Sequence, residues 1–354
     1  MTAHRPQCTH TKAFRDAMHH SVATVPLAVT AAMLYARFAA SSTRPGLCRL
    51  FALIPVLALL LVLPFLIPLY GVRGLVAFFL VWLGEFKLLL LAFGHGPLDP
   101  HIRPLPFVFT AALPVKLRRQ ISKDAAVTKT KTKTVLLSSS IKFAATAAIV
   151  HHLHHSKERT HPYAAFVLFG IITYCILDSV LPCVAATGRA LGMELEPQFN
   201  KPYLAASLQD FWGRRWNLMV SAVLRPSVYN PVRAHLGVPA GVLATFLVSG
   251  LMHEVMAYYL TFRAPTGQVT AFFVLHGASM CAERWCARRW SARPPRVVAT
   301  PLVVAFVVGT ACWLFLPAIF GDGMDDLYLA EAAALVSSFR DVGARFLGLG
   351  SLGS

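Results

Sequence analysis

Long uninterrupted runs of apolar residues are the feature that most constrains how this chain can fold. Several runs approach the roughly 20 residues that a helix needs to cross a hydrocarbon core about 30 Å thick. Backbone at that depth must satisfy its own hydrogen bonds, which favours helices. Of the 354 residues, 56% are hydrophobic and 14% are charged, and the mean hydropathy is +0.58. The predicted fold class is therefore all-α, a polytopic transmembrane helical bundle.

The apolar runs define the candidate membrane spans, which are 21–40, 51–70, 74–94, 135–152, 163–187, 236–262, 269–283 and 298–320. The stretch 105–115 is short and is interpreted as re-entrant or interfacial, so we expect about eight or nine spans. The first run lacks a small-residue cleavage site, which favours a retained helix over a removed signal. The predicted organisation is a polar tail (1–20), a multi-span domain (21–320) and a C-terminal tail (321–354) with a possible helix over 327–346.

The net charge of +17 is concentrated in three segments, Lys116–Lys133, Arg189–Arg233 and Arg284–Arg296. In our assignment two spans separate each segment from the next, so all three lie on one side of the membrane. Basic residues gather in the cytosolic loops of membrane proteins. We therefore interpret these segments as cytosolic loops, and we expect membrane lipids and no nucleic acid as partners.

The loop ahead of the run 236–262 is too polar to span a membrane and too aromatic for a plain linker. Ser207 followed by Asp210 has the Ser-x-x-Asp pattern of a helix start. At helical spacing, one stripe holds Asp210, Arg214, Asn217 and Ser221, and the other face holds Trp212, Trp216, Met219 and Val223. This pattern predicts an interfacial amphipathic helix whose polar stripe faces the protein interior, and a mere membrane anchor is the alternative.

An adjacent histidine and glutamate, His253 and Glu254, lie inside the otherwise apolar run 236–262. Ionisable groups at that depth are costly unless they are paired or hydrated, so both are functional candidates. Ser249 lies one turn before His253 on the same face, whereas Glu254 points about 100° away and is not expected to orient the imidazole. A neutral imidazole suits a general base, and a packing histidine bonded to a nearby carbonyl is the alternative. A zinc-protease motif is excluded because Ala257 stands where its second histidine would be.

A histidine cluster, His151-His152-Leu153-His154-His155, fits the His-x-x-His-His box of membrane di-iron desaturases and hydroxylases. A two-iron site of this kind needs about eight histidines in several boxes, and the sequence has no second box. A polar, partly hydrated span end is the preferred interpretation. A membrane di-iron lipid desaturase or hydroxylase is kept as an alternative function.

The block NKPYLAASLQDFWGRRWN at 200–217, followed by Tyr229-Asn-Pro and by His253-Glu254 in the next span, resembles the plant wax synthase family of the membrane-bound O-acyltransferases. The Phe-Trp-x-x-x-Trp-Asn signature with an intramembrane histidine 36 residues after Asn217 is a specific combination. The resemblance is strongest over about 195–260. It implies an acyl-CoA-dependent long-chain-alcohol O-fatty-acyltransferase with the bundle of that superfamily, in the endoplasmic reticulum membrane and without a cofactor. A sterol or diacylglycerol acceptor and a lipid transporter with a histidine proton relay are alternatives.

The resemblance implies roles for the matched residues. His253 would be the catalytic base that accepts the proton of the alcohol. Asn217 would donate to the developing oxyanion or orient a substrate. Trp212 and Trp216 would shape the acyl-donor site. Because it lies beside His253, Ser249 is added to the predicted substrate-binding residues.

Three arginines of the polar loop are candidates to pair with the phosphates of CoA, and they are Arg214, Arg215 and Arg225. We assign Arg214 to substrate binding. Lipid headgroups and the positive-inside bias are alternative reasons for these charges. The predicted partners are acyl-CoA and a long-chain alcohol or sterol.

Overall fold

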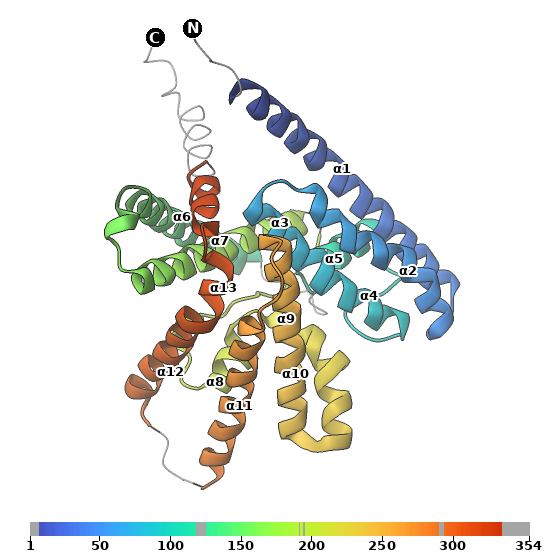
Figure 1. Cartoon of the computed structure of the whole chain (residues 1–354). Helices are drawn as coiled ribbons and strands as arrows, with labels where there is room; N and C mark the ends of the chain where they lie inside the picture. The colour runs from blue at the N-terminus through green and yellow to red at the C-terminus, as the bar shows by residue number, and fades with distance from the viewer. Residues whose placement is uncertain (1–6, 118–124, 191, 194, 290–293, 335–354) are drawn as a thin grey trace. The chain divides into compact units, whose positions relative to one another are not determined.

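The computed structural model describes residues 7–117, 125–190, 192–193, 195–289 and 294–334, and Figure 1 shows its elements. The chain forms two compact units, Met1–Arg119 with Gly188–Phe306, and Gln120–Thr187 with Val307–Ser354. The described elements are helices, and extended pairing in this described part is limited to one bridge between Leu117 and Leu195. The predicted all-α class is confirmed.

The N-terminal helices of the first unit pack around one apolar core, and they are α1 (Gln7–Ser42), α2 (Leu47–Val62), α4 (Glu85–Ala92) and α5 (Pro104–Ala112). Met33, Leu53 and Leu88 are fully buried in this core. The first helix begins at Gln7, inside the segment 1–20 predicted to be a polar tail. The apolar run from Ser21 therefore continues a helix that has already started.

A second core joins the N-terminal helices to the C-terminal part of the first unit. Helix α3 (Tyr70–Ala77) and the π-helical stretch η2 (Phe78–Gly84) continue directly into α4. The fully buried ring of Trp82 packs there in one cluster with Leu224 and Met256. This packing places the 70–92 segment directly against the candidate site.

Helix α10 (Asn230–Thr261) is a helical hairpin, and Figure 1 shows its two arms side by side. The turn is at Gly237, whose φ of 84° and ψ of 177° lie outside the helical region and favour glycine. The arms pack closely, since a Cβ on Gly241 would lie 3.1 Å from the Cβ of Arg233. The predicted span 236–262 corresponds to the second arm.

Helix α11 (Gln268–Arg289) packs against the second arm of α10. The contact is close at Gly250, where an added Cβ would lie 2.8 Å from the Cα of Thr270. A larger residue at this position would push the two helices apart. Gly250, the small residue of the Ser-Gly-Leu-Met-His sequence, therefore allows α11 to pack closely against the helix that carries His253.

The second unit is built from α6 (Ala125–Ser156), α7 (Pro162–Ala190), η7 (Ala311–Phe315), α13 (Leu316–Phe320) and a helical stretch over 324–334. The predicted helix 327–346 is described only to residue 334, and the rest lies outside the described residues. In the histidine cluster at the end of α6, the rings of His151 and His155 are 4.5 Å apart. Among the described residues, no group of three or more potential ligand side chains is arranged to hold a metal ion.

Within the described residues, six helical segments have the length and hydropathy needed to cross a bilayer, and they are Ala23–Ser42, Leu47–Leu66, Tyr70–Ala92, Pro162–Arg189, Leu218–Thr261 and Arg296–Phe320. Each corresponds in the main to one predicted span. The predicted spans 135–152 and 269–283 lie in α6 and α11, which are helical but are not among these six. The stretch 105–115 overlaps the nine-residue α5, which begins one residue earlier at Pro104. The expected total of eight or nine spans therefore stays a prediction.

Candidate active site

The polar loop ahead of the hairpin is held by an acidic residue and its partners. Ser207 Oγ accepts the backbone N–H of Asp210 at 2.9 Å, which confirms the helix start predicted from the Ser-x-x-Asp pattern. Asp210 accepts the Nε–H of Arg214 at 3.1 Å and the Nε–H of Arg215 at 2.7 Å. Partial burial opposes ionisation, but the Arg215 hydrogen bond and the charges of both arginines outweigh it and lower the pKa of Asp210 below its ordinary value. The charged Asp210 thus connects Arg214 and Arg215 to the start of the loop helix.

Asn217 stands at a sharp break between the π-helical turn η5 (Phe211–Arg215) and α9 (Leu218–Leu224). Its φ of 41° and ψ of 67° are left-handed, a region that asparagine tolerates better than most residues. Its side-chain oxygen accepts the N–H of Val220 at 3.4 Å and caps α9. The prediction of one continuous amphipathic helix through this loop is wrong, because the left-handed residue ends one helical segment and starts the next.

His253 lies in the second arm of α10 between two aromatic rings. It stacks on Phe273 of α11 with centroids 4.1 Å apart, and it meets Trp82 edge-to-face at 4.5 Å. Its Nδ1 is 2.7 Å from the carbonyl oxygen of Ser249. Because a carbonyl oxygen only accepts, Nδ1 must carry the proton of this hydrogen bond. The lone pair of the neutral imidazole then lies on Nε2, the nitrogen that can accept a proton.

Glu254 has a different task from its neighbour. Its buried Oε1 accepts the N–H of Thr270 at 3.0 Å, in the first turn of α11. A carboxylate at this position satisfies an end group of the helix and complements the positive end of its dipole. Glu254 therefore anchors α11 to α10, in agreement with the expectation that it does not orient His253.

Two tryptophans of the predicted motif form an aromatic wall. The indole N–H of Trp212 donates to Nδ1 of His276 at 3.1 Å, and its backbone carbonyl accepts the hydroxyl of Ser221 at 3.2 Å. Trp216 stacks on Phe211 with ring planes 14° apart. Both rings thus have specific partners within the protein.

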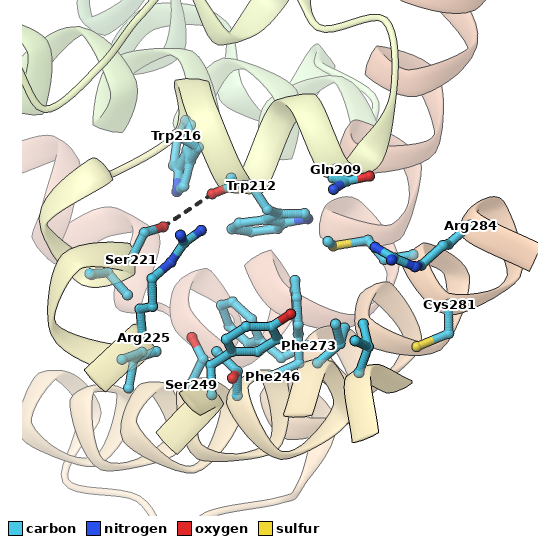
Figure 2. Close-up of a pocket in the computed structure, with 18 of the residues that line it drawn as sticks. Gln209, Trp212, Trp216, Ser221, Arg225, Phe246, Ser249, Phe273, Cys281 and Arg284 are labelled. Carbon is cyan, nitrogen blue, oxygen red and sulfur yellow. Dashed lines mark hydrogen bonds between the residues drawn. The ribbon is translucent and has the colours of Figure 1, made fainter. Parts of the chain in front are cut away.

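These elements surround a cavity of about 330 Å³, shown in Figure 2. Five of the six predicted site residues line it, namely His253, Asn217, Trp212, Trp216 and Ser249. Figure 2 shows the indole of Trp212 projecting between Trp216 on one side and Phe246 on the other. The break at Asn217 turns the motif loop over the hairpin, so the two sequence motifs meet in one cavity. The chemical roles of these residues stay predictions.

The sixth predicted residue, Arg214, lies outside this cavity. Its side chain is 72% exposed, pairs with Asp210 and lines a neighbouring polar groove of about 920 Å³. Arg215 is held by Asp210 and by the carbonyl of Asn200 at 3.1 Å, whereas Arg225 does line the cavity. The prediction that Arg214 shares a stripe with Asn217 is wrong because the two do not belong to one helix.

Sequence reasoning missed several residues of the site. Trp82 was only one apolar residue of the predicted span 74–94, yet its ring contacts His253. His276 is not among the predicted site residues, although an ionisable residue in the apolar run 269–283 carries the same signal as His253. Arg284 and Arg288 line the cavity from the end of α11, and their place follows only from how that helix packs.

Comparison with known proteins shows the family to which the chain belongs. Residues 195–275 match the model of the membrane bound O-acyl transferase family. The chain is also 40% identical over 317 residues to the long-chain-alcohol O-fatty-acyltransferase of Simmondsia chinensis, which covers 84% of this chain and 89% of the relative. The chain belongs to the wax synthase family of membrane-bound O-acyltransferases. The family predicted from the motifs is therefore confirmed.

Further wax synthase relatives align over a similar length. The chain is 38% identical over 311 residues to the probable long-chain-alcohol O-fatty-acyltransferase 1 of Arabidopsis thaliana, with 84% of this chain and 90% of the relative covered. It is 35% identical over 327 residues to the acyl-CoA–sterol O-acyltransferase 1 of the same plant, with 87% and 92% covered. The matched family region contains Trp212, Asn217 and His253.

Proposed function

We propose that this wax synthase family member transfers a fatty acyl group from acyl-CoA to the hydroxyl of a long-chain alcohol. The observation that carries the proposal is the placement of His253, which lines the cavity with its Nδ1 proton held by the Ser249 carbonyl. One relative that aligns over most of the chain is named a long-chain-alcohol O-fatty-acyltransferase, and a second is named a probable one. A sterol is the second acceptor to test, because a third relative is named as a sterol acyltransferase. Family membership favours this function over the di-iron and transporter interpretations.

The proposed reaction needs a base because an alcohol is a poor nucleophile while it keeps its proton. The hydroxyl proton passes to Nε2 of His253 as the alcohol oxygen bonds to the thioester carbonyl carbon. The C–S bond then breaks, and the CoA thiolate leaves and takes up the proton from His253. General-base help of this kind contributes about 10²- to 10⁴-fold to a rate. No metal or redox cofactor takes part in this proposed sequence.

Asn217 is proposed as the donor to the oxyanion that forms during the attack. Its side-chain oxygen is engaged by the N–H of Val220, so the amide nitrogen is the atom with hydrogens to donate. The capping bond fixes the side chain at the cavity wall before substrate arrives. A preorganised donor of this kind typically contributes about 2.7–4 kcal/mol.

The arginine-rich groove beside the cavity supports CoA as the acyl carrier. Arg284 and Arg288 line both the cavity and the groove, and Arg296 lines the groove. None of the ion pairs found among the described residues involves these three arginines. A carrier with several phosphates would supply the missing negative charge while its thioester reaches the cavity.

The two acidic residues of the groove do not neutralise these arginines. Asp210 already pairs with two other arginines of the loop. Glu283 accepts the backbone N–H groups of Leu208 and Gln209, each at 3.1 Å, and so caps the short helix α8 (Leu208–Asp210). The positive charge of Arg284 and Arg288, which line both the cavity and the groove, is therefore available to bind an anionic ligand.

We predict that the double variant Arg284→Gln/Arg288→Gln raises the KM for acyl-CoA by about tenfold, the effect of roughly 1.4 kcal/mol. The KM for the alcohol and the kcat are expected to change little. Initial rates with acyl-CoA and with acyl-3′-dephospho-CoA provide the measurement. If the arginines contact the 3′-phosphate, the variant and wild type differ less with the dephospho donor. Arg159→Gln, an exposed arginine of the second unit, is the matched control. An unchanged KM in the double variant would contradict the assignment.

The experiment that tests the proposed function is an ester assay with the full-length chain. Microsomes from yeast without its own neutral-lipid acyltransferases would receive labelled palmitoyl-CoA with hexadecanol, a sterol or diacylglycerol. We expect wax ester to be the main product. Sterol ester or triacylglycerol alone would reassign the acceptor, and no ester from well-expressed protein would reject the transferase proposal.

We also propose the endoplasmic reticulum as the membrane in which the enzyme resides. The apolar helices support a membrane protein in general. Fractionation of tagged full-length protein from plant cells tests the compartment. Co-migration with an endoplasmic reticulum marker is expected, and co-migration with plasma membrane or plastid markers would contradict it.

A further inference from the structure

His276 is a histidine in surroundings that are otherwise largely aromatic and apolar. It lies in α11 and is fully buried. Its ring contacts Phe272 at 4.3 Å and Phe306 at 5.0 Å, measured between ring centroids. Burying the polar imidazole in such surroundings is unfavourable unless its nitrogens find hydrogen-bond partners. The polar atoms of His276 therefore need a reason beyond filling space.

That reason is the indole of Trp212. Its Nε1–H donates to Nδ1 of His276 at 3.1 Å, and the two rings are nearly perpendicular at 86°. Because an indole N–H only donates, Nδ1 must be the acceptor and so carries no proton in this bond. The two histidines are therefore opposite tautomers: Nδ1 accepts a hydrogen bond in His276, whereas Nδ1 donates one in His253.

The indole of Trp212 is held from two directions and forms part of the cavity wall. At the backbone end, its carbonyl accepts the hydroxyl of Ser221 at 3.2 Å. At the far end of the ring, His276 holds the N–H. The rings of Phe246 and Phe273 pack against the indole, each with its centroid 5.7 Å from that of Trp212. Figure 2 shows this ring projecting into the middle of the lined space.

We propose that His276 is a positioning residue that locks the Trp212 indole and thereby sets the length of the hydrocarbon chain that the cavity accepts. A fixed indole limits the space along the cavity, whereas an indole without its acceptor can rotate about its side-chain bonds and give way to a longer chain. The ligand chemistry is a linear hydrocarbon, supplied by the acyl group or by the alcohol. This inference rests on the proposed acyltransferase function.

The test compares chain preferences in wild type, His276→Phe and His276→Asn. The phenylalanine keeps a ring between Phe272 and Phe306 but lacks the acceptor, while the asparagine places an amide oxygen near the position of Nδ1. One arm varies the donor, palmitoyl-CoA against behenoyl-CoA, with hexadecanol. The other arm varies the acceptor, hexadecanol against docosanol, with palmitoyl-CoA. In the arm whose chain meets Trp212, we expect His276→Phe to shift the kcat/KM ratio toward the longer chain by about three- to tenfold, the range for one hydrogen bond.

Three further measurements separate this role from simple packing. His276→Asn is expected to keep the wild-type chain preference. In a Trp212→Phe background, which has no indole donor, His276→Phe is expected to cause no additional shift. The exposed His235→Phe, outside the cavity, is the matched control and leaves the preference unchanged. If His276→Phe does not accumulate, His276→Leu gives a second variant without the acceptor.

Two outcomes would overturn the inference. One is an abundant His276→Phe or His276→Leu protein with the wild-type chain preference in both arms. The other is an equal shift in the presence and absence of the Trp212 indole. If instead the proposed acyltransferase function is wrong, wild type forms no ester at all, which distinguishes that result from the two outcomes above.

Discussion

His253→Ala is expected to lower ester formation by about 10²- to 10⁴-fold while the protein remains abundant in the membrane. The expected loss reflects the absent proton acceptor, because Nε2 carries the lone pair once Nδ1 donates to Ser249. The ring also packs between Trp82 and Phe273, so its removal leaves a void next to the cavity. Initial rates with saturating palmitoyl-CoA and hexadecanol, normalised to protein by immunoblot, give the measurement.

The control for His253 must separate chemistry from packing. His253→Gln fills part of the space and offers an amide, but it cannot act as a base at neutral pH. We expect it to be about as inactive as His253→Ala and better retained in detergent thermostability assays. His235→Ala, an exposed histidine outside the cavity, should keep wild-type rates. Full activity in abundant His253→Ala would remove His253 from the mechanism.

Asn217→Gly is expected to lower kcat by about 10²- to 10³-fold, the usual cost of losing one oxyanion donor. Glycine adopts the left-handed backbone of this position without strain, and it is itself an acceptable helix N-cap. The fold of the loop is therefore expected to survive while the amide donor is lost. Steady-state kinetics should show the loss in kcat, with the KM values nearly unchanged.

Asn217→Ala is the matched comparison for this prediction. Alanine loses the same amide, but its Cβ is strained at a φ of 41° and the cap on Val220 disappears. These two effects each cost about 1 kcal/mol, so thermal stability should fall along with the rate. If Asn217→Gly is stable and retains wild-type kcat, Asn217 is a structural cap and not the oxyanion donor.

Several features were predictable because they depend on short stretches of sequence. The apolar runs predict helices since backbone in lipid has few other ways to satisfy its hydrogen bonds. Ser207 and Asp210 predict the start of α8 because a cap needs only residues three positions apart. His253 was a candidate because an ionisable residue in an apolar run is costly wherever the run packs.

Other features were not predictable in this way. Helical spacing placed Arg214 and Asn217 on one stripe, but the left-handed turn at Asn217 separates them. A local pattern does not reveal such a turn, since asparagine also occurs within helices, at helix caps and in ordinary loops. The contact between Trp82 and His253 joins residues far apart in the sequence, so no period or motif signals it.

The sequence by itself determined the helical membrane class, the family and the identity of the candidate base. These depend on composition and on motifs whose chemistry is contained in neighbouring residues. Only the tertiary structure decided which side chains surround that base. The hairpin at Gly237 and the close approach at Gly250 bring Phe273 and His276 into place, and the break at Asn217 directs Trp212 to them. Those placements result from helix packing, where free energy is spread over many weak contacts that no local pattern encodes.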